Sequence, residues 1–259
     1  MELFTAARRK GLANLLSPAF PTRLIDASGS LTKAQELQDQ GYGLIAATTH
    51  PTLSDIPREL LALWKEGAFT NSDVTIPIAY YQYLQLKWLA DGLSTATSAS
   101  AHPIVTPDAN AKGVNVEELP VGHGNIAFFK AAKQTLANQG VVFVAPNAGR
   151  RGELEVPEVK STEYLLRLAH NAQIPVALLP FGVEVDGATD YDVDLYGGIN
   201  PRKKYTIYAG DVLTDDEIAR RLSQLGGERS EKNPYEGVDE WLFGYIFPSL
   251  VTRAYGGLL

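Results

Sequence analysis

The chain contains no cysteine and only one methionine among its 259 residues. The lack of thiols excludes a disulfide framework, a thiolate nucleophile and a zinc–sulfur site, so any chemistry must come from oxygen and nitrogen groups. Long apolar runs are also missing, since none approaches the roughly 18 to 20 residues that a membrane-spanning helix needs. Charges interrupt the first ten positions, where a signal peptide would carry its apolar centre. We therefore expect a cytoplasmic protein.

Positive charge is in the minority, with 23 basic against 30 acidic residues and a net charge of -7. A nucleic-acid-binding protein needs a basic surface to neutralise phosphates, so this balance argues against such a partner. Basic residues gather at 8–10, 150–151 and 202–204. Clusters of basic residues most often lie on a solvent-exposed face, and we expect that here unless they bind a ligand.

Apolar segments of strand length alternate with segments of helical periodicity along most of the chain. This alternation predicts an α/β fold, with a central, mostly parallel or mixed β-sheet flanked by helices. Expected helices cover 1–16, 31–40, a stretch capped by Thr52 or Ser54 and ending at Gly67, 80–93, 126–139 and 161–172. Expected strands cover 43–49, 74–79, 103–106, 141–145, 174–185 with an interruption at Pro180, and 204–209. With 45% hydrophobic residues, we expect a single domain over 1–259, with an N-terminal helical segment at 1–40, a core at 43–210 and a C-terminal helical extension at 211–259.

For two segments near the ends of the sequence, contact with a membrane is one of the alternatives. The helix at 1–16 has an apolar side interrupted by Arg8, Arg9 and Lys10, so it could rest on a membrane surface or pack against its own domain. The apolar segment 241–250 is too short to span a bilayer. Core packing is its default, and a dimer surface or a peripheral membrane contact are the alternatives.

His50 and Asp55 stand at a corner between an expected strand and an expected helix. A carboxylate that folds back onto one imidazole nitrogen fixes the tautomer and leaves the other nitrogen free to take a proton from a hydroxyl. The alternative is that Asp55 only caps the helix beside an unrelated His50.

A basic loop follows the strand at 141–145 and carries Gly149, Arg150 and Arg151. Guanidinium groups and open backbone N–H groups suit a phosphate or carboxylate, which they can bind through bidentate hydrogen bonds. An ordinary glycine turn with exposed arginines is the alternative.

These pieces and their order resemble the glycerolipid acyltransferase family, which includes bacterial lysophosphatidic acid acyltransferases and the plastid-type glycerol-3-phosphate acyltransferases. The family's first motif is Asn-His, one variable residue, Ser or Thr, two variable residues and Asp. The segment from Thr49 to Asp55 fits this pattern except at Thr49. The resemblance implies a glycerol-3-phosphate acyltransferase-like fold, His50 as the general base and Asp55 as its orienting partner.

The family's third motif is a strand that ends in Pro-Glu-Gly-Thr-Arg. This chain keeps Pro146 and Arg150 but has Asn147 where the family has glutamate. The family's second motif supplies an arginine after another strand, yet no arginine lies between Arg58 and Arg150. This anion contact is therefore either missing or supplied by Lys112 or Lys130. The resemblance implies substrate contacts from Thr52, Pro146, Asn147, Gly149, Arg150 and Arg151.

The resulting hypothesis is an O-acyltransferase of lipid metabolism. It would move a fatty acyl group from acyl-coenzyme A or acyl carrier protein, as co-substrate, to a hydroxyl of a lipid or phosphate-bearing acceptor. No further cofactor and no metal are expected, because no His-Glu-X-X-His segment is present. Aromatic residues that could wall an acyl groove are Tyr80, Tyr81, Tyr83 and Trp88. The alternative is a catalytically weak acyltransferase-like module that binds lipid or acyl chains.

Overall fold

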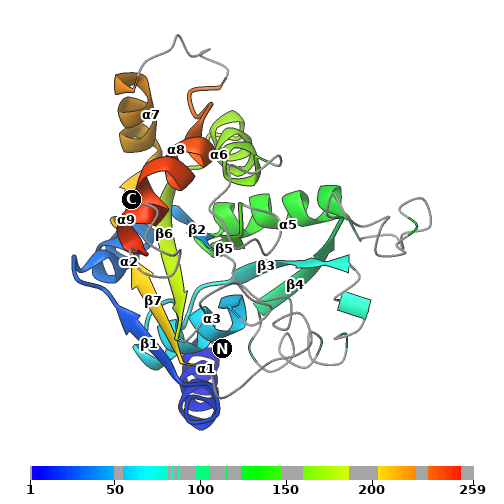
Figure 1. Ribbon diagram of the computed structural model, residues 1–259. Coiled ribbons are helices and arrows are strands. Elements are labelled where there is room, and N and C mark those ends of the chain that lie inside the picture. The colour runs from blue at the N-terminus through cyan, green and yellow to red at the C-terminus, as the bar shows by residue number, and fades with distance from the viewer. Residues whose placement is uncertain are drawn as a thin grey trace.

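The computed structural model describes residues 2–49, 55–80, 83–84, 87, 91, 97, 99–105, 115, 124–146, 160–186, 204–225 and 233–251. Over these ranges the chain forms an eight-stranded sheet with helices on both faces (Figure 1). The strands are β1 Thr22–Ile25, β2 Gly43–Thr48, β3 Val74–Ala79, β4 Ala99–Ile104, β5 Val141–Val144, β6 Val176–Val185, β7 Tyr205–Ala209 and β8 Leu213–Thr214. The helices are α1 Glu2–Leu16, α2 Ser30–Asp39, α3 Asp55–Lys65, α5 Asn125–Ala137, α6 Ser161–Asn171, α7 Asp215–Gln224, α8 Val238–Trp241, the π-helix η4 Leu242–Ile246 and α9 Phe247–Leu250.

The sheet is mixed and mostly parallel, as the sequence predicts. Its strand order is β1-β7-β6-β2-β5-β3-β4, with β8 paired to β6. The pairs β6–β2, β2–β5, β5–β3 and β3–β4 are parallel. Strands β7 and β8 run antiparallel to β6. The α/β fold class is therefore confirmed.

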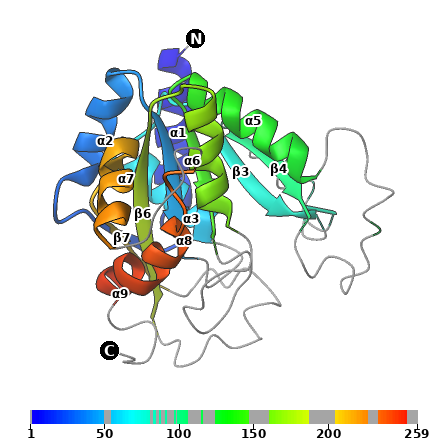
Figure 2. The ribbon, with the colours of Figure 1, turned by 90° about the horizontal axis from the view of Figure 1, so that it is seen from above.

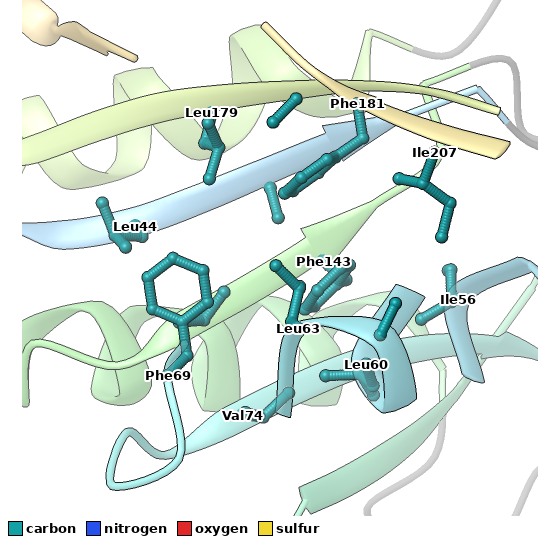
Figure 3. Packing of buried hydrophobic residues seen from close by; sticks show 14 of the residues in the cluster. Leu44, Ile56, Leu60, Leu63, Phe69, Val74, Phe143, Leu179, Phe181 and Ile207 are labelled. Atoms are coloured by element: carbon teal, nitrogen blue, oxygen red, sulfur yellow. The ribbon is translucent and has the colours of Figure 1, made fainter. Parts of the chain in front are cut away.

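Two hydrophobic cores lie on opposite faces of the sheet, because alternate residues of each strand point to opposite sides. Leu44 and Phe143 join the core covered by α1, α2 and α3 (Figure 3). Ile45 and Val142 join the core covered by α5, α6, α7 and the C-terminal helices. Every residue of β2 is buried, as expected for a strand covered on both faces.

The observed strands differ from the expected ones at β1, β4, β6 and β8. Strand β4 begins at Ala99, earlier than the expected start at 103, and the short strands β1 and β8 were not predicted. Strand β6 is continuous through Pro180, where an interruption was expected. The antiparallel partner of β6 changes from β7 to β8 around this residue, and the Pro180 carbonyl accepts a hydrogen bond from the N–H of Gly210 (2.8 Å). Proline is tolerated at such a break in a ladder.

Both terminal segments pack against the domain. Helix α1 lies against α3, and the C-terminal segment buries Trp241, Phe243 and Phe247 in the core beneath α5 and α6. Figure 2 shows α9 close to β6, where a side chain at Gly182 would collide with Val251. Core packing, the default expected for 241–250, is confirmed. In the part of the chain that is described, no helix has the length and apolarity needed to cross a membrane.

Arg9 contradicts the expectation that the basic trio at 8–10 forms a solvated face. Its side chain is 1% exposed and lies over the ring of Trp64. The guanidinium donates hydrogen bonds to four backbone carbonyls, those of Thr97 (2.7 Å), Phe69 (3.2 Å), Thr70 (2.9 Å) and Ser72 (2.6 Å). Burial lowers the pKa of Arg9 to about 10, against the opposing effect of Asp73. Arg9 therefore fastens α1 to the turn that leads into β3.

Replacing Arg9 with methionine keeps most of the side-chain volume but leaves the buried carbonyls without donors. We expect Arg9→Met to lower the free energy of unfolding by about 3 kcal/mol, the scale of lost hydrogen bonds to a charged group. Chemical denaturation followed by circular dichroism measures this change. The neighbouring Lys10→Met, at an exposed position, should change stability by less than about 0.5 kcal/mol. Equal effects of the two substitutions would contradict the role given to Arg9.

Candidate active site

The order of the strands creates a switch point between β2 and β5. After β2 the chain passes to α3 on one face of the sheet and returns as β3, beyond β5. After β5 it passes to α6 on the other face and returns as β6, beyond β2. Two adjacent parallel strands thus send their connections to opposite faces. In open α/β sheets ligands bind outside the carboxyl ends of such strands.

The two sequence motifs follow these two strands. Ala47 and Val144 are register partners, three residues before His50 and Asn147 respectively. Asp55 is the first residue of α3, and Pro146 follows β5 and is buried. The chain therefore enters both motif segments from neighbouring positions, at the carboxyl ends of two adjacent central strands.

Most of the predicted site residues lie outside the described residues. They are His50, Thr52, Asn147, Gly149, Arg150 and Arg151, together with the side chain of Asp55. The pairing of His50 with Asp55 and the contacts of the basic loop stay predictions. Of the lysines considered as a replacement for the missing arginine, Lys130 is exposed on α5 and Lys112 is not described. Of the aromatic residues, Tyr80 is half-buried and Tyr83 is buried, whereas Tyr81 and Trp88 lie outside the described ranges.

A cluster of buried polar residues that the sequence reasoning missed surrounds the end of β2. Thr48, Thr49 and Glu59 are completely buried, and Arg58 is 1% exposed. The Thr48 hydroxyl contacts the Glu59 carboxyl group, which connects the end of β2 to the second turn of α3. The Arg58 guanidinium lies 4.0 Å from the ring centroid of Tyr205 on β7. The beginning of α3 is therefore attached to two strands through buried polar contacts.

The sequence did contain a signal for this cluster. Arg58 and Glu59 are adjacent charged residues between the apolar positions Ile56 and Leu60, and Thr48 and Thr49 end an otherwise apolar strand. Polar residues at positions that a hydrophobic pattern marks as buried usually have specific partners.

A second buried carboxylate holds the beginning of α6, the helix that follows the basic loop. Asp239 of α8 is completely buried and accepts hydrogen bonds from the backbone N–H groups of Thr162 (3.3 Å) and Glu163 (3.0 Å). The residue at the N-cap position, Lys160, makes no side-chain capping bond, so α8 supplies the cap. Lys160 instead pairs with Glu240 at 2.9 Å. Burial raises the pKa of Asp239 to about 6, although its hydrogen bonds act in the opposite direction.

The structure also has a pocket of about 330 Å³, and none of the described residues that line it is a predicted site residue. It opens beside the end of β7, between α7 and α9, with Asp211, Arg221 and Ser249 among its polar lining residues. Among the residues that can be described, no group of three or more His, Asp or Glu side chains could hold a metal ion.

The sequence matches no protein-family model, and a search of curated proteins finds no match either. The resemblance to glycerolipid acyltransferases therefore rests on the motifs themselves and on their order along the chain.

The raised pKa of Asp239 predicts a pH dependence of stability. Between its ordinary value of 3.8 and about 6, the folded protein binds a proton that the unfolded chain releases. The contribution of Asp239 is therefore full at low pH, and the free energy of unfolding decreases as the pH rises through this interval, by about 2 to 3 kcal/mol. Urea denaturation from pH 4 to 7 measures it as the difference between wild type and Asp239→Asn.

The exposed Asp216→Asn is the matched control and should follow the wild-type curve. Parallel curves for wild type and Asp239→Asn would show that this carboxyl group titrates alike in both states.

Proposed function

We propose that the protein is an O-acyltransferase that moves a fatty acyl group from an acyl thioester to a hydroxyl. One observation carries this proposal: the segment that holds the His50 motif and the segment that holds the Arg150 motif leave adjacent, parallel strands at the switch point of the sheet. Ligands of open α/β sheets bind at such points, so one substrate could contact both segments. The motifs follow one another along the chain in the same order as in glycerolipid acyltransferases, and this resemblance supports acyl transfer as the reaction type.

In the proposed reaction His50 removes the proton from the acceptor hydroxyl while its oxygen attacks the thioester carbonyl carbon. An ester C–O bond forms and the C–S bond breaks. The proton then passes from His50 to the sulfur of the leaving thiol, so no covalent enzyme intermediate and no redox partner are needed. Asp55 would hold the imidazole in the correct tautomer, and backbone N–H groups at the start of α3 would stabilise the oxyanion.

The basic loop would hold the negative group of a substrate. Arg150, with Arg151, can bind a phosphate or carboxylate through parallel hydrogen bonds. Because Asn147 replaces the glutamate of the family motif, we propose that the acceptor differs from that of typical members. The donor would be acyl-coenzyme A or acyl carrier protein. For a lipid acceptor, the protein would work as a cytoplasmic enzyme in peripheral contact with a membrane.

The general base can be tested by substitution. Positioning and proton transfer each contribute several kcal/mol to the barrier, so His50→Ala should lower kcat by roughly 100-fold or more. The assay combines radiolabelled octanoyl- or palmitoyl-coenzyme A, or palmitoyl-acyl carrier protein, with glycerol 3-phosphate, lysophosphatidic acid or long-chain alcohols, and follows the ester product. His170→Ala is the control, because His170 lies exposed on α6 against Tyr235.

Full activity of His50→Ala would remove this mechanism. Binding of the acyl donor by wild type without an ester product from any acceptor would instead favour the alternative, a module that only binds acyl chains.

The anion contact can be tested separately. Loss of a charge-assisted, bidentate contact should raise KM for a phosphate-bearing substrate by about 10-fold to 100-fold in Arg150→Ala, with a smaller effect on kcat. Steady-state kinetics at varied concentrations of that substrate measure the change. Arg220→Ala, an exposed arginine on α7, should leave KM unchanged. An unchanged KM in Arg150→Ala would assign the anion to other residues.

A further inference from the structure

Strand β2 ends in two consecutive threonines whose side chains are completely buried. Up to this point β2 follows a regular parallel ladder with β6, in which Thr48 is the register partner of Phe181. The N–H of Thr49 continues the ladder by donating to the carbonyl of Phe181 at 3.0 Å. In a regular parallel ladder, the N–H of Val183 would then donate to the carbonyl of Thr49.

The hydroxyl of Thr49 takes the place of its own carbonyl. The N–H of Val183 donates to Thr49 Oγ1 at 2.8 Å. The Thr49 carbonyl instead accepts a hydrogen bond from Thr48 Oγ1 at 2.9 Å. Because no buried backbone group loses its partner by this exchange, the strand can end in the interior without an unsatisfied N–H.

The exchange involves the peptide group that leads to His50. The Thr49 carbonyl belongs to the peptide group that joins Thr49 to His50. The ladder with β6 therefore loses its regular acceptor at the peptide group that precedes His50. The same Thr48 hydroxyl also contacts the Glu59 carboxyl group on α3, the helix that begins with Asp55. Two hydroxyls therefore fix the peptide before His50 relative to β6 and to the helix on which Asp55 stands.

We propose that Thr48 and Thr49 are positioning residues for His50. Their hydroxyls hold the orientation of the peptide group that joins Thr49 to His50. The inference rests on the proposed function of His50 as a general base. Proton transfer needs the imidazole within hydrogen-bond distance of the acceptor hydroxyl, and a misplacement of about 1 Å can reduce the rate by about 100-fold. A hydroxyl that controls the peptide before His50 thus affects catalysis without touching a substrate.

The test compares threonine-to-valine substitutions, which keep the shape and remove the hydroxyl. In Thr49→Val the carbonyl of residue 49 is expected to return to the ladder and accept the hydrogen bond from the N–H of Val183. This change rotates the peptide group that precedes His50. We expect kcat to decrease by 10-fold to 100-fold in Thr49→Val and in Thr48→Val, with KM within about twofold of wild type. Thr49→Ser keeps the hydroxyl and should restore most of kcat.

The chain offers a matched control at Thr75. Its hydroxyl is also buried and bonded, at 2.7 Å, to the hydroxyl of Thr135. Thr75 and Ile45 are both register partners of Val142 on β5. Thr75 therefore lies toward the end of the sheet that is away from the two motif segments. Thr75→Val should lose a similar amount of stability without a change in kcat. A decrease in kcat in all three valine variants, in proportion to lost stability, would show a general structural effect and overturn the proposal.

A second measurement does not depend on activity. The C2 proton of each histidine gives an NMR signal, and the signal of His50 is the one that disappears in His50→Gln. We expect this signal to move in Thr48→Val and Thr49→Val and to keep its wild-type position in Thr75→Val. An unmoved signal in both site variants overturns the positioning role. A moved signal in a protein without acyl transfer keeps that role and rejects the proposed function alone.

Discussion

The buried central strand β2 is the element on which the rest of the structure depends. It is covered on both faces and paired in parallel on both edges, to β6 and to β5. This arrangement leaves no freedom in register, because a shift by one residue would move Leu44 and Ile45 into the wrong cores. The carboxyl ends of β2 and β5 therefore stand side by side, and the connections that follow them begin together.

Buried polar side chains complete this arrangement by satisfying backbone groups where regular structure ends. Arg9 supplies donors to carbonyls of the turn before β3, Asp239 supplies an acceptor to the first N–H groups of α6, and Thr49 supplies one to Val183. Each links elements that are far apart in sequence. An interior in which backbone groups keep their partners can hold sharp chain reversals at defined positions. Of these three side chains, Asp239 and Thr49 act next to the segments that carry the proposed chemistry.

The hydrophobic pattern predicted most of the fold because it reports burial directly. The continuous apolar runs of β2, β5 and β6 were recognisable as strands covered on both faces. The short strand β1 was not recognisable, because its half-exposed pattern depends on pairing with β7, which is distant in sequence. The continuity of β6 through Pro180 could not be predicted either, since it depends on a change of partner strand.

Less of the candidate site was predictable. Local spacing identified His50, Asp55 and Arg150 as chemically suitable residues, and strand order brings their segments to one edge of the sheet. The positions of Thr48, Glu59 and Asp239 could not be inferred, because hydrogen bonds between distant elements leave no periodic trace. A polar residue in an apolar pattern signals a partner without saying which one.

The central claim is that the segments following β2 and β5 act on the same substrate molecule. A crystal structure of the protein soaked with the phosphate-bearing acceptor that gives an ester product in the acyl-transfer assay tests it most directly. The account predicts that one ligand has a hydroxyl about 3 Å from the His50 imidazole and its phosphate on the Arg150 guanidinium. A ligand bound to one of these residues while the other points away from it would contradict the account.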